Sequence, residues 1–371
     1  MNLSYWEQNS YLSNIDYTIV GSGIVGLNCA LQLRLRFPKA NILILEKGVL
    51  PQGASTKNAG FACFGSLSEI LDDLKSHSEE EVVALIQKRR SGLELLRHNL
   101  SDSAMDYKQY GGYELFNQKD AEGFHHCMSQ MGKVNSLLKP YFKADVFEVK
   151  DNPFHFKNIQ NQLSFTPFEG QIDTGKMMRS LTDLVLRKGV LILNSVAVES
   201  FEDLKNKVHI KTNHFEFNSN RMLICTNGFA TKLIDVEVKP ARAQVLITKP
   251  IKNLKIKGTF HLDEGYYYFR NIDNRILLGG GRNLDFKTEE TTEMGETELI
   301  QNKLKSLLES TILPQTPFEI DYSWSGIMGV GSTKSPIVKQ LSSQVFCGVR
   351  LGGMGIAIGS HVGKEIADLV N

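Results

Sequence analysis

Near its start the chain carries three glycines spaced as Gly-x-Gly-x-x-Gly over residues 21–26. Residues 17–20 before them form a continuous apolar run typical of a buried strand, and the pattern over 27–36 predicts a helix. A second apolar run at 41–45 predicts another strand, and continuous apolarity is typical of a parallel sheet covered on both faces. The chain therefore opens with a βαβ unit whose glycines lie at the strand–helix junction.

If a dinucleotide binds there, each position of this motif has a physical requirement for glycine. Gly21 allows the tight turn, Gly23 lets a pyrophosphate approach the backbone, and Gly26 lets the helix pack on the strand, while the helix N-terminus faces the phosphate charge. Glu46 follows about 20 residues later, at the end of the second strand, where it can accept hydrogen bonds from an adenosine ribose. The motif predicts a dinucleotide site, the alternative being a glycine-rich turn in an unrelated α/β fold.

A second strand–glycine–helix junction lies at residues 348–359. Residues 53–62 are small and polar, with no apolar strand where an NAD domain would continue its sheet. Two helix N-termini that serve one ligand indicate a long ligand spanning the sheet, with its pyrophosphate at one end and a ring system at the other. The second N-terminus would stabilise the anionic reduced form of a flavin, so these features favour FAD.

Charge and length exclude several other classes of protein. Lys+Arg 42 against Asp+Glu 41 leaves a net charge of +1, so no basic surplus exists for nucleic-acid or anionic-membrane binding. The N-terminal segment lacks the pattern of a secretory signal, and the longest apolar stretch, 17–33, is shorter than the roughly 20 residues of a membrane span. A chain of 371 residues exceeds what one core usually serves, so two domains are expected.

The cysteines and histidines predict neither a disulfide framework nor a metal site. The five cysteines are dispersed without a CxxC pair, and the nine histidines form no HxH or HxxxH pair. We therefore expect reduced thiols, a cytoplasmic location and no metal. His261 and His361 are expected to be structural, and Cys63 is expected to be a packed small residue instead of a redox partner.

The remaining pattern predicts further elements along the chain. An antiparallel sheet is expected over 236–324, where strand-like runs alternate with turns. The other expected elements are helices over 78–99, 174–188 and 296–308, strands over 190–193, 221–226 and 344–349, and a closing helix that ends near residue 370.

Eight sequence blocks, which follow one another along nearly the whole chain, carry a family resemblance. They read IVGSGIVGL, GASTKNAGFA, the segment 173–198, CTNGFAT, PARAQVLITKP, GYYYFRNIDNRILLGGGR, WSGIMG and LGGMGIAIGSHVGKEIADL. In these blocks the chain resembles the D-amino-acid oxidase superfamily of FAD-dependent oxidoreductases, which holds glycine oxidase, sarcosine oxidases and γ-glutamylputrescine oxidoreductases. The blocks are specific for the superfamily and not for a substrate.

The resemblance implies an α/β fold with a Rossmann-type FAD-binding domain, whose sheet is mainly parallel, and an α+β substrate domain with an antiparallel sheet over the flavin. We expect residues 1–85, 165–235 and 325–371 to form the FAD-binding domain, and 86–164 and 236–324 to form the substrate-binding domain. The residues expected to contact non-covalent FAD are Gly21, Ser22, Gly23, Val25, Gly26, Glu46, Lys47, Ser55, Asn58, Ala59, Val198, Thr226, Gly228, Gly353, Met354, Gly355 and Ile356.

Three departures from better-known relatives bear on function. Met328 stands where the resemblance would place an Arg that grips the substrate carboxylate, so a simple α-amino acid held at that point is disfavoured. Leu277 stands where monomeric sarcosine oxidases have a Lys that assists the reaction with oxygen. Asn58 and Gly326 occupy the positions at which some relatives attach flavin covalently.

Three residues are candidates for the catalytic site. Tyr266 and Tyr268 share one face of a predicted strand with Arg270. The resemblance directs Tyr266 at the substrate, whereas the alternative is that these tyrosines only stabilise a sheet. Arg350 lies before the second glycine-rich turn, where it could anchor an anionic substrate group or form a structural ion pair. For Arg242 a structural role is expected.

The resemblance implies oxidation of a C–N bond in a small-molecule amine or N-substituted amino acid, by hydride transfer to flavin N5, giving an imine that hydrolyses. No acid–base pair is required, because the cofactor carries the chemistry. Oxidase and dehydrogenase remain open, and so does the oligomeric state. The alternatives are an FAD module acting on a modified tRNA nucleoside, which the near-neutral charge disfavours, and an accessory flavoprotein subunit that passes electrons to a partner.

Overall fold

The apolar run that precedes the glycine motif forms the central strand of the first sheet. In the computed structural model, which describes residues 3–370, the strand order is β17-β18-β11-β1-β2-β8, with β9 and β10 attached beside β11. Strands β18, β11, β1, β2 and β8 run parallel, and β17 is an antiparallel edge. The bounds are β1 (Ile15–Val20), β2 (Ile42–Leu45), β8 (Leu191–Leu193), β9 (Val198–Asp203), β10 (Val208–Thr212), β11 (Glu216–Ile224), β17 (Ile337–Gln340) and β18 (Val345–Val349).

This strand order is that of a Rossmann-type nucleotide-binding sheet. Chain progression reverses between β1 and β11, and ligands bind at the carboxyl ends of the strands beside such a reversal. The predicted parallel sheet is therefore present, and its reversal point coincides with the Gly21 turn at the end of β1.

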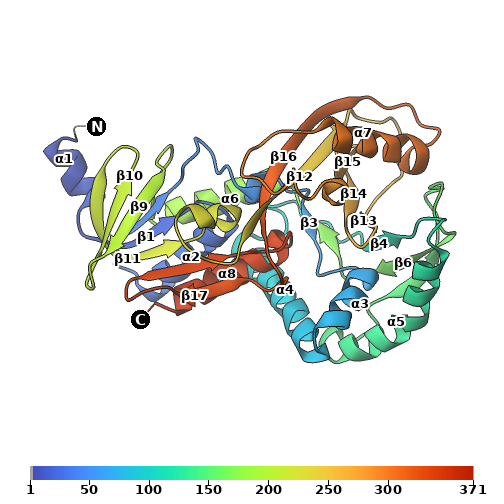
Figure 1. The fold of residues 1–371 in the computed structure, drawn as a ribbon, viewed down its shortest axis with the longest axis horizontal. Helices are drawn as coiled ribbons and strands as arrows, with labels where there is room; N and C mark the ends of the chain where they lie inside the picture. Colours follow the sequence, from blue (N-terminus) through green and yellow to red (C-terminus); the bar gives the residue numbers. More distant parts are fainter. Residues whose placement is uncertain (1–2, 371) are drawn as a thin grey trace.

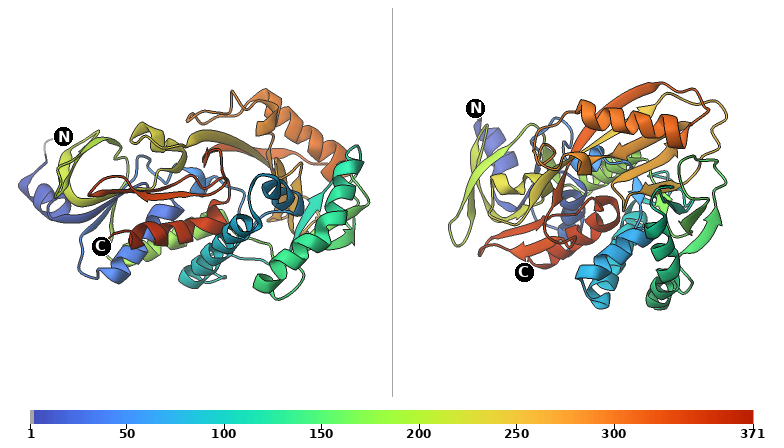
Figure 2. Two further views of the ribbon diagram at one scale, coloured as in Figure 1. Left: turned by 60° about the horizontal axis from the view of Figure 1, so that its bottom comes forward. Right: turned by 45° about the vertical axis from the view of Figure 1, so that its right-hand side comes forward.

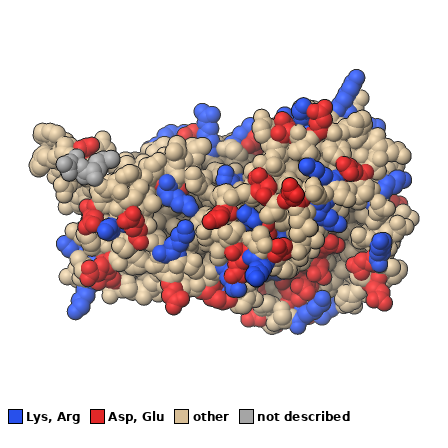
Figure 3. Space-filling view, turned by 45° about the horizontal axis from the view of Figure 1, so that its top comes forward, with Lys and Arg blue, Asp and Glu red and all other residues tan. Residues whose placement is uncertain are grey.

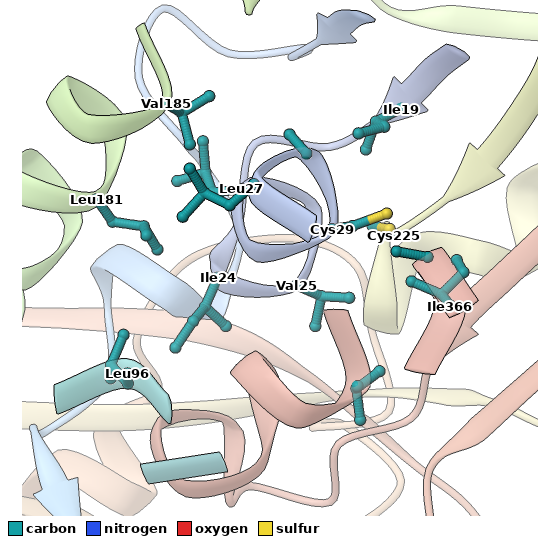
Figure 4. Close-up of a cluster of buried hydrophobic side chains, with 14 of the residues drawn as sticks. Ile19, Ile24, Val25, Leu27, Cys29, Leu96, Leu181, Val185, Cys225 and Ile366 are labelled. Atoms are coloured by element: carbon teal, nitrogen blue, oxygen red, sulfur yellow. The ribbon is translucent and has the colours of Figure 1, made fainter. Parts of the chain in front are cut away.

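Helices cover one face of this sheet, as the left view of Figure 2 shows. They are α2 (Ile24–Arg36), α6 (Thr174–Arg187) and α8 (Gly355–Asp368), and α4 (Glu79–Leu100) packs on α8 from outside. Figure 4 shows the core around α2, where Leu27 is fully buried and Cys29 lies beside Cys225. Burial raises the pKa of the Cys29 thiol well above its ordinary value, so Cys29 remains a neutral, packed thiol.

The opposite face of the sheet is closed by a second apolar cluster. Leu43 and Leu45 of β2 meet Val208 and Ile210 of the β9–β10 pair there. Because both faces are covered, every residue of β2 is buried. This burial explains the continuous apolarity of that segment.

The second sheet has the order β16-β12-β15-β14-β13-β4-β6-β5 and is antiparallel except for the β13–β4 pair (Figure 1). Its bounds are β4 (Gly112–Leu115), β5 (Glu148–Asp151), β6 (Gln162–Thr166), β12 (Lys239–Thr248), β13 (Thr259–Leu262), β14 (Tyr267–Ile272), β15 (Arg275–Gly280) and β16 (Ile320–Val330). On its outer face Phe260 and Phe269 stack with ring centroids 4.5 Å apart, and Ile300 and Leu304 of α7 (Glu298–Leu307) cover them.

Two helices beyond those predicted complete the second lobe. They are α3 (Leu67–Ser76) and α5 (Ala121–Phe142), which pack together and on α4 through an apolar cluster that includes Ile70, Ile86 and Val134. The remaining elements are short: α1 (Tyr5–Glu7), η1 (Gln8–Leu12), η2 (Ala54–Thr56), β3 (Phe61–Ala62), β7 (Gly170–Gln171), η3 (Asn227–Lys232), η4 (Arg282–Leu284) and η5 (Leu308–Ile312).

The sheets do not divide the chain at the predicted domain boundaries. Strand β16 belongs to the antiparallel sheet over its whole length, whereas the predicted boundary at residue 325 falls inside it. The boundary at 86 cuts α4, which packs on α8 of the first lobe. The assignment of the two lobes to FAD and substrate stays a prediction.

Within residues 3–370 no helix combines the length and apolarity that crossing a membrane requires. Lys and Arg are interspersed with Asp and Glu over the face drawn in Figure 3, as the near-zero net charge leads one to expect.

Candidate functional site

A cavity of about 730 Å³ lies between the carboxyl ends of the parallel strands and the inner face of the antiparallel sheet. Val20, Leu45 and Cys225 line it from the first sheet, and Val245 and Tyr268 line it from the second. A cavity at the switch point of an α/β sheet is the expected position for a nucleotide ligand.

The turn after β1 forms one end of the cavity. Gly21 has a φ of 101°, and a Cβ there would lie 3.0 Å from the Cys225 carbonyl oxygen, so only glycine adopts this turn without strain. A Cβ on Gly23 would lie 3.0 Å from Ser55 Oγ, the atom that accepts a hydrogen bond from the Ile24 N–H at the start of α2. This end is thus an open backbone cradle at a helix N-terminus, as a pyrophosphate requires.

Glu46 and Lys47 follow β2 at the same end. Glu46 is 5% exposed, and its carboxylate accepts hydrogen bonds from Ser22 N and Oγ at 3.0 and 2.9 Å and from Gly48 N at 3.0 Å. Lys47 Nζ lies 3.4 Å from the centroid of the Phe229 ring, and its pKa is lowered by burial and by the neighbouring charge of Lys232. Glu46 is thereby held facing the cavity as a hydrogen-bond acceptor.

The start of α8 forms the other end of the cavity. Gly352 and Gly353 have φ values of 57° and 82°, and the N-cap residue Met354 provides no side-chain cap, so the first N–H groups of α8 lack side-chain acceptors. Thr226 Oγ1, which is buried at the cavity wall, has no hydrogen-bond partner within residues 3–370. These unfulfilled donors and the glycine cradle fit FAD spanning both helix termini.

One row of residues crosses the inner face of the antiparallel sheet above the cavity. Strand register pairs its members one to the next in the order Glu114, His261, Tyr268, Gly279, Val245 and Trp324. Tyr267 and Phe269 point to the opposite face, into the aromatic core, as strand alternation predicts. Tyr266 directly precedes β14, is 38% exposed and also lines the cavity.

The tyrosine hydroxyl in this row is neutral. Burial raises the pKa of Tyr268 to about 12, so its O–H remains a hydrogen-bond donor near neutral pH. Arg270, which shares this face, is buried and donates to the carbonyl oxygens of Ala59 and Ile172, so it fastens the sheet to the segment after η2.

A buried ion pair lies beside Tyr268. His261 Nε2 and Glu169 Oε2 are 2.9 Å apart, and Thr259 Oγ1 donates to the same carboxylate at 2.9 Å. Burial alone would lower the pKa of His261, but the charge and hydrogen bond of Glu169 raise it to about 9. The imidazole is therefore a cation at neutral pH.

Cys63 completes the nearest approach to a metal-ligand set among the described residues. Its Sγ and the ligand atoms of Glu169 and His261 all lie within 4.8 Å of one another. Burial raises the pKa of the Cys63 thiol well above its ordinary value, and Glu169 already accepts two hydrogen bonds. These contacts favour a protonated ion-pair cluster over a metal site. Metal binding would require the Cys63 thiol and the His261 imidazolium each to lose a proton.

Arg350 is placed outside the cavity lining. Its Nε donates to the Ser335 carbonyl oxygen at 3.0 Å, Nη1 donates to Glu237 Oε2 at 2.7 Å, and Nη2 donates to Thr333 Oγ1 at 3.0 Å. Of the two roles left open by the sequence, these contacts favour the structural ion pair. Arg242 likewise forms a bidentate pair with Glu289, with both distances 2.8 Å.

Most residues expected to contact FAD line the cavity, together with Tyr266 and Tyr268. The exceptions are Ser22, which holds Glu46; Gly26, where a Cβ would lie 2.0 Å from the Gly21 oxygen; and Gly228, where a Cβ would lie 2.3 Å from the Met328 oxygen. These three shape the site from behind its wall. Which residues bind FAD and substrate stays a prediction.

Several polar residues that line the cavity were not predicted from the sequence as site residues. His261 was expected to be structural, and Arg282, Lys57 and Glu69 were not singled out, yet all four line the cavity. Strand alternation could have identified His261 once its pairing with Tyr268 was known. Arg282 could have been noticed as a charged residue directly after a strand and a glycine pair.

Comparison with known proteins agrees with this geometry. A family model described as FAD dependent oxidoreductase matches residues 16–369. The chain is 19% identical to Probable oxidoreductase OrdL of Haemophilus influenzae, over 97% of this chain and 83% of that protein. It is 21% identical to Gamma-glutamylputrescine oxidoreductase of Escherichia coli, over 96% of this chain and 83% of that protein.

Among solved structures, glycine oxidase from Geobacillus kaustophilus superposes with a TM-score of 0.75. The identity is 18%, and the match covers 96% of this chain and 94% of that one. This likeness confirms the predicted fold class, with its parallel Rossmann-type sheet and its second, antiparallel sheet.

Proposed function

The chain belongs to the DAO family of FAD-dependent oxidoreductases, and from this premise we propose that it oxidises a C–N bond of an amine or N-substituted amino acid. The observation that carries the proposal is the single cavity that joins the glycine cradle of the first lobe to the tyrosine-bearing face of the second. FAD, when bound, supplies the acceptor for the hydride and its two electrons. The oxidised product is an imine, which water hydrolyses.

The relatives support the substrate class. Two of them are named for amine-containing substrates, glycine and gamma-glutamylputrescine. One part of the cavity wall also suits an uncharged amine, because Val245, Met328 and Met354 give that part an apolar surface. An apolar wall disfavours an ammonium ion and leaves the nitrogen lone pair available for imine formation.

The residues above the cavity orient the substrate and exclude water. Tyr268 offers a neutral hydroxyl from a buried position, and Tyr266 lies at the exposed margin of the cavity. Fixing the substrate carbon against the cofactor is the main contribution a protein makes to such a reaction. No proton-transfer residue is assigned, since an amine that binds neutral needs none.

The direct test is an anaerobic spectral titration. The purified protein is expected to be yellow, and one member of a panel of N-methyl amino acids, D-amino acids and polyamine derivatives should bleach it. Readmission of oxygen then separates an oxidase, whose colour returns at once, from a dehydrogenase that needs another acceptor. A protein that neither contains nor takes up FAD would refute the proposal. Bleaching only by hydroxy acids would refute the substrate class.

A matched pair of tyrosine variants tests the site. Tyr266→Phe should retain its flavin and lower kcat/KM about three- to tenfold, the value of one hydrogen bond to substrate. Tyr11→Phe, which alters a half-exposed tyrosine of η1, should match the wild type in stopped-flow reduction. Equal rates of flavin reduction in the two variants would show that Tyr266 does not contact the substrate.

A further inference from the structure

We propose that the ion pair between Lys334 and Asp73 is a clasp between the two lobes, which must open for FAD to enter or leave the cavity. The clasp concerns the loading of the cofactor and goes beyond the proposed function, because it acts in the same way whichever substrate is oxidised. Lys334 Nζ and Asp73 Oδ1 are 2.6 Å apart, and they come from two segments that both border the cavity.

Lys334 belongs to residues 331–336, which we call the strap because they join β16 of the second sheet to β17 of the first. Residues 331–334 line the cavity, and the first two of them are exposed, so the strap forms part of the cavity rim. A Cβ on Gly352 would lie 3.5 Å from the Lys334 carbonyl oxygen. The strap therefore passes beside the glycine turn before α8, at the end of the cavity that fits the ring system of FAD.

The backbone of the strap is fastened to the first lobe. Arg350, which directly follows β18, donates to the Ser335 carbonyl oxygen and to Thr333 Oγ1, with both distances 3.0 Å. These two acceptors lie on either side of Lys334 in the chain. Arg350 is held in turn by Glu237, whose Oε2 lies 2.7 Å from Arg350 Nη1. The strap is thus a rigid extension of the first lobe, and the side chain of Lys334 reaches out from it.

Asp73 holds the other side of the clasp, on α3 of the second lobe. A Cβ on Gly265 would lie 2.9 Å from the Glu69 carboxyl group, so the turn between β13 and β14 meets α3 one helical turn before Asp73. Glu264 of that turn is exposed and lines the cavity, so the turn and the strap border the same mouth. Within residues 3–370, no other ion pair or hydrogen bond joins the strap to α3.

Arg89 of α4 allows the clasp to open without leaving Asp73 stranded. Arg89 is 4% exposed and donates to the Phe64 carbonyl oxygen at 2.6 Å, but it forms no ion pair with a described residue. Burial lowers the pKa of Arg89, and the charges of Glu69 and Asp73 oppose that shift. Asp73 therefore keeps a cationic neighbour when Lys334 leaves, whereas a buried carboxylate that lost its only cation would be strongly destabilised.

Lys334 is the side of the clasp that can move. Its side chain is 39% exposed, and its long flexible stem can carry the ammonium group from Asp73 into water. An ion pair that is partly exposed contributes little stability, so it opens readily. A ligand that spans the cavity from the Gly21 turn to the Met354 turn cannot leave while the end near Met354 is closed, and the clasp then limits its exchange.

A clasp and a direct ligand contact differ in their effect on FAD binding. Opening a clasp raises the rate constants of association and dissociation by the same factor, because it changes the barrier and not the bound state. Loss of a direct contact raises the dissociation rate constant alone and therefore raises the Kd. The two rate constants together decide whether Lys334 controls access to the cavity or touches the cofactor.

The test measures FAD exchange by stopped flow, from the absorbance change when FAD meets flavin-free protein and from FAD release after dilution of the loaded protein. Lys334→Met should raise both rate constants about two- to fivefold, the value of one partly exposed ion pair, with the Kd unchanged. Lys334→Arg should resemble the wild type. Lys364→Met, which breaks an exposed ion pair with Asp368 on α8 away from the cavity, is the control and should also match the wild type.

A double-mutant cycle assigns the effect to the pair. Asp73→Asn should accelerate exchange as much as Lys334→Met, and the double variant should be no faster than either single variant. Added NaCl should bring the release rate of the wild type closer to that of Lys334→Met, because salt weakens the pair only where it is present. Additive effects in the double variant would overturn the clasp, and so would a raised Kd with an unchanged association rate constant.

Hydrogen exchange provides a readout that involves neither turnover nor FAD release. In flavin-loaded Lys334→Met, the amides of the strap and of the second half of α3 should exchange faster than in the wild type, while those of α4 should be unchanged. Unchanged exchange in the strap would overturn the clasp. Because none of these measurements uses a substrate, a protein that binds FAD and oxidises no amine would refute the proposed reaction and leave the clasp standing.

Discussion

At the scale of single residues, the unusual feature is a histidine that is buried and yet charged. The same burial that would discharge His261 also strengthens its attraction to Glu169, 2.9 Å away, and the attraction prevails. Glu114, the cross-strand neighbour of His261, has its own pKa raised by burial while it accepts hydrogen bonds from Ser66 and Ser68. The cavity is thus bordered on this side by a compact polar cluster.

This ion pair predicts a pH dependence of stability. The folded pKa of His261, about 9, exceeds its ordinary value of 6.5, so its contribution is complete below about pH 6.5 and is lost as the pH rises through 9. The free energy of unfolding in urea should therefore fall over this window. In the His261→Gln/Glu169→Gln double variant that fall should be smaller, while His261→Gln alone should destabilise the protein because it strands the carboxylate. An unchanged pH profile in the double variant would contradict this role.

The residue-level prediction succeeded where the information was local. Alternation along β14 predicted that Tyr268 and Arg270 would oppose Tyr267 and Phe269, and the structure confirms it. The charge state of His261 was unpredictable because Glu169 lies 92 residues away in the sequence. The ion pair of Arg350 was unpredictable for the same reason, since Glu237 is 113 residues away in the sequence.

At the scale of elements, the close approach of α4 and α8 fixes the helix terminus that faces the cavity. A Cβ on Gly92 of α4 would lie 2.2 Å from the carbonyl oxygen of Ala357 in the first turn of α8. Glycine at this point therefore determines how near α8 lies to the rest of the first lobe. The turn at Gly353 and Met354 leads directly into α8, so the position of this turn depends on where the helix lies.

Two glycine-to-alanine variants should shift stability in opposite directions. Gly92→Ala should destabilise the protein by about 1–3 kcal/mol, because the helices must separate, and should weaken FAD binding. Gly132→Ala, at an exposed position of α5 with open space around it, should be neutral or stabilising by up to about 1 kcal/mol. Urea unfolding at saturating FAD measures both. Equal effects at the two positions would show that the contact between Gly92 and Ala357 does not determine how closely α4 and α8 pack.

Elements with strong end signals were predictable from sequence. Asp173 caps α6 by accepting a hydrogen bond from Lys176 N at 2.8 Å, as its position before the apolar pattern indicated. The β13–β4 pairing could not be predicted, because it joins segments far apart in the chain in a parallel sense inside an otherwise antiparallel sheet. Helices α3 and α5 were not predicted, although Ser66 and Asp120 cap them.

At the scale of the whole molecule, the cavity is formed by both lobes, so its ligand should stabilise them together. FAD at about a hundred times its Kd should add about 2.7 kcal/mol to the free energy of unfolding. ADP, which reaches only the end near Gly21 and Glu46, should stabilise less at the same ligand concentration, because its Kd is higher. Thermal unfolding of flavin-free protein with each ligand provides the comparison. A response to ADP as large as that to FAD would mean that α8 and the second sheet take no part in binding.

The sequence predicted two lobes and the parallel sheet, because the glycine motif and the continuous apolar runs are local signals of that architecture. The predicted boundary at residue 325 stays a prediction, although it falls inside β16, which extends from Ile320 to Val330 without a break. A domain boundary inside a continuous strand is not marked by the polar and glycine-rich residues that usually indicate a loop. Only the pairing of β16 with β12 reveals to which sheet it belongs.

Gly279 occupies the middle of the row above the cavity, and neighbouring side chains fill the space that its own side chain would occupy. A Cβ there would lie 2.5 Å from Val245 Cγ1 and 2.6 Å from Tyr268 Cε2, so a larger residue would have to displace side chains that line the cavity. Gly279 itself does not line the cavity. A substitution at Gly279 would therefore change the shape of the cavity through Val245 and Tyr268, without replacing any residue that lines it.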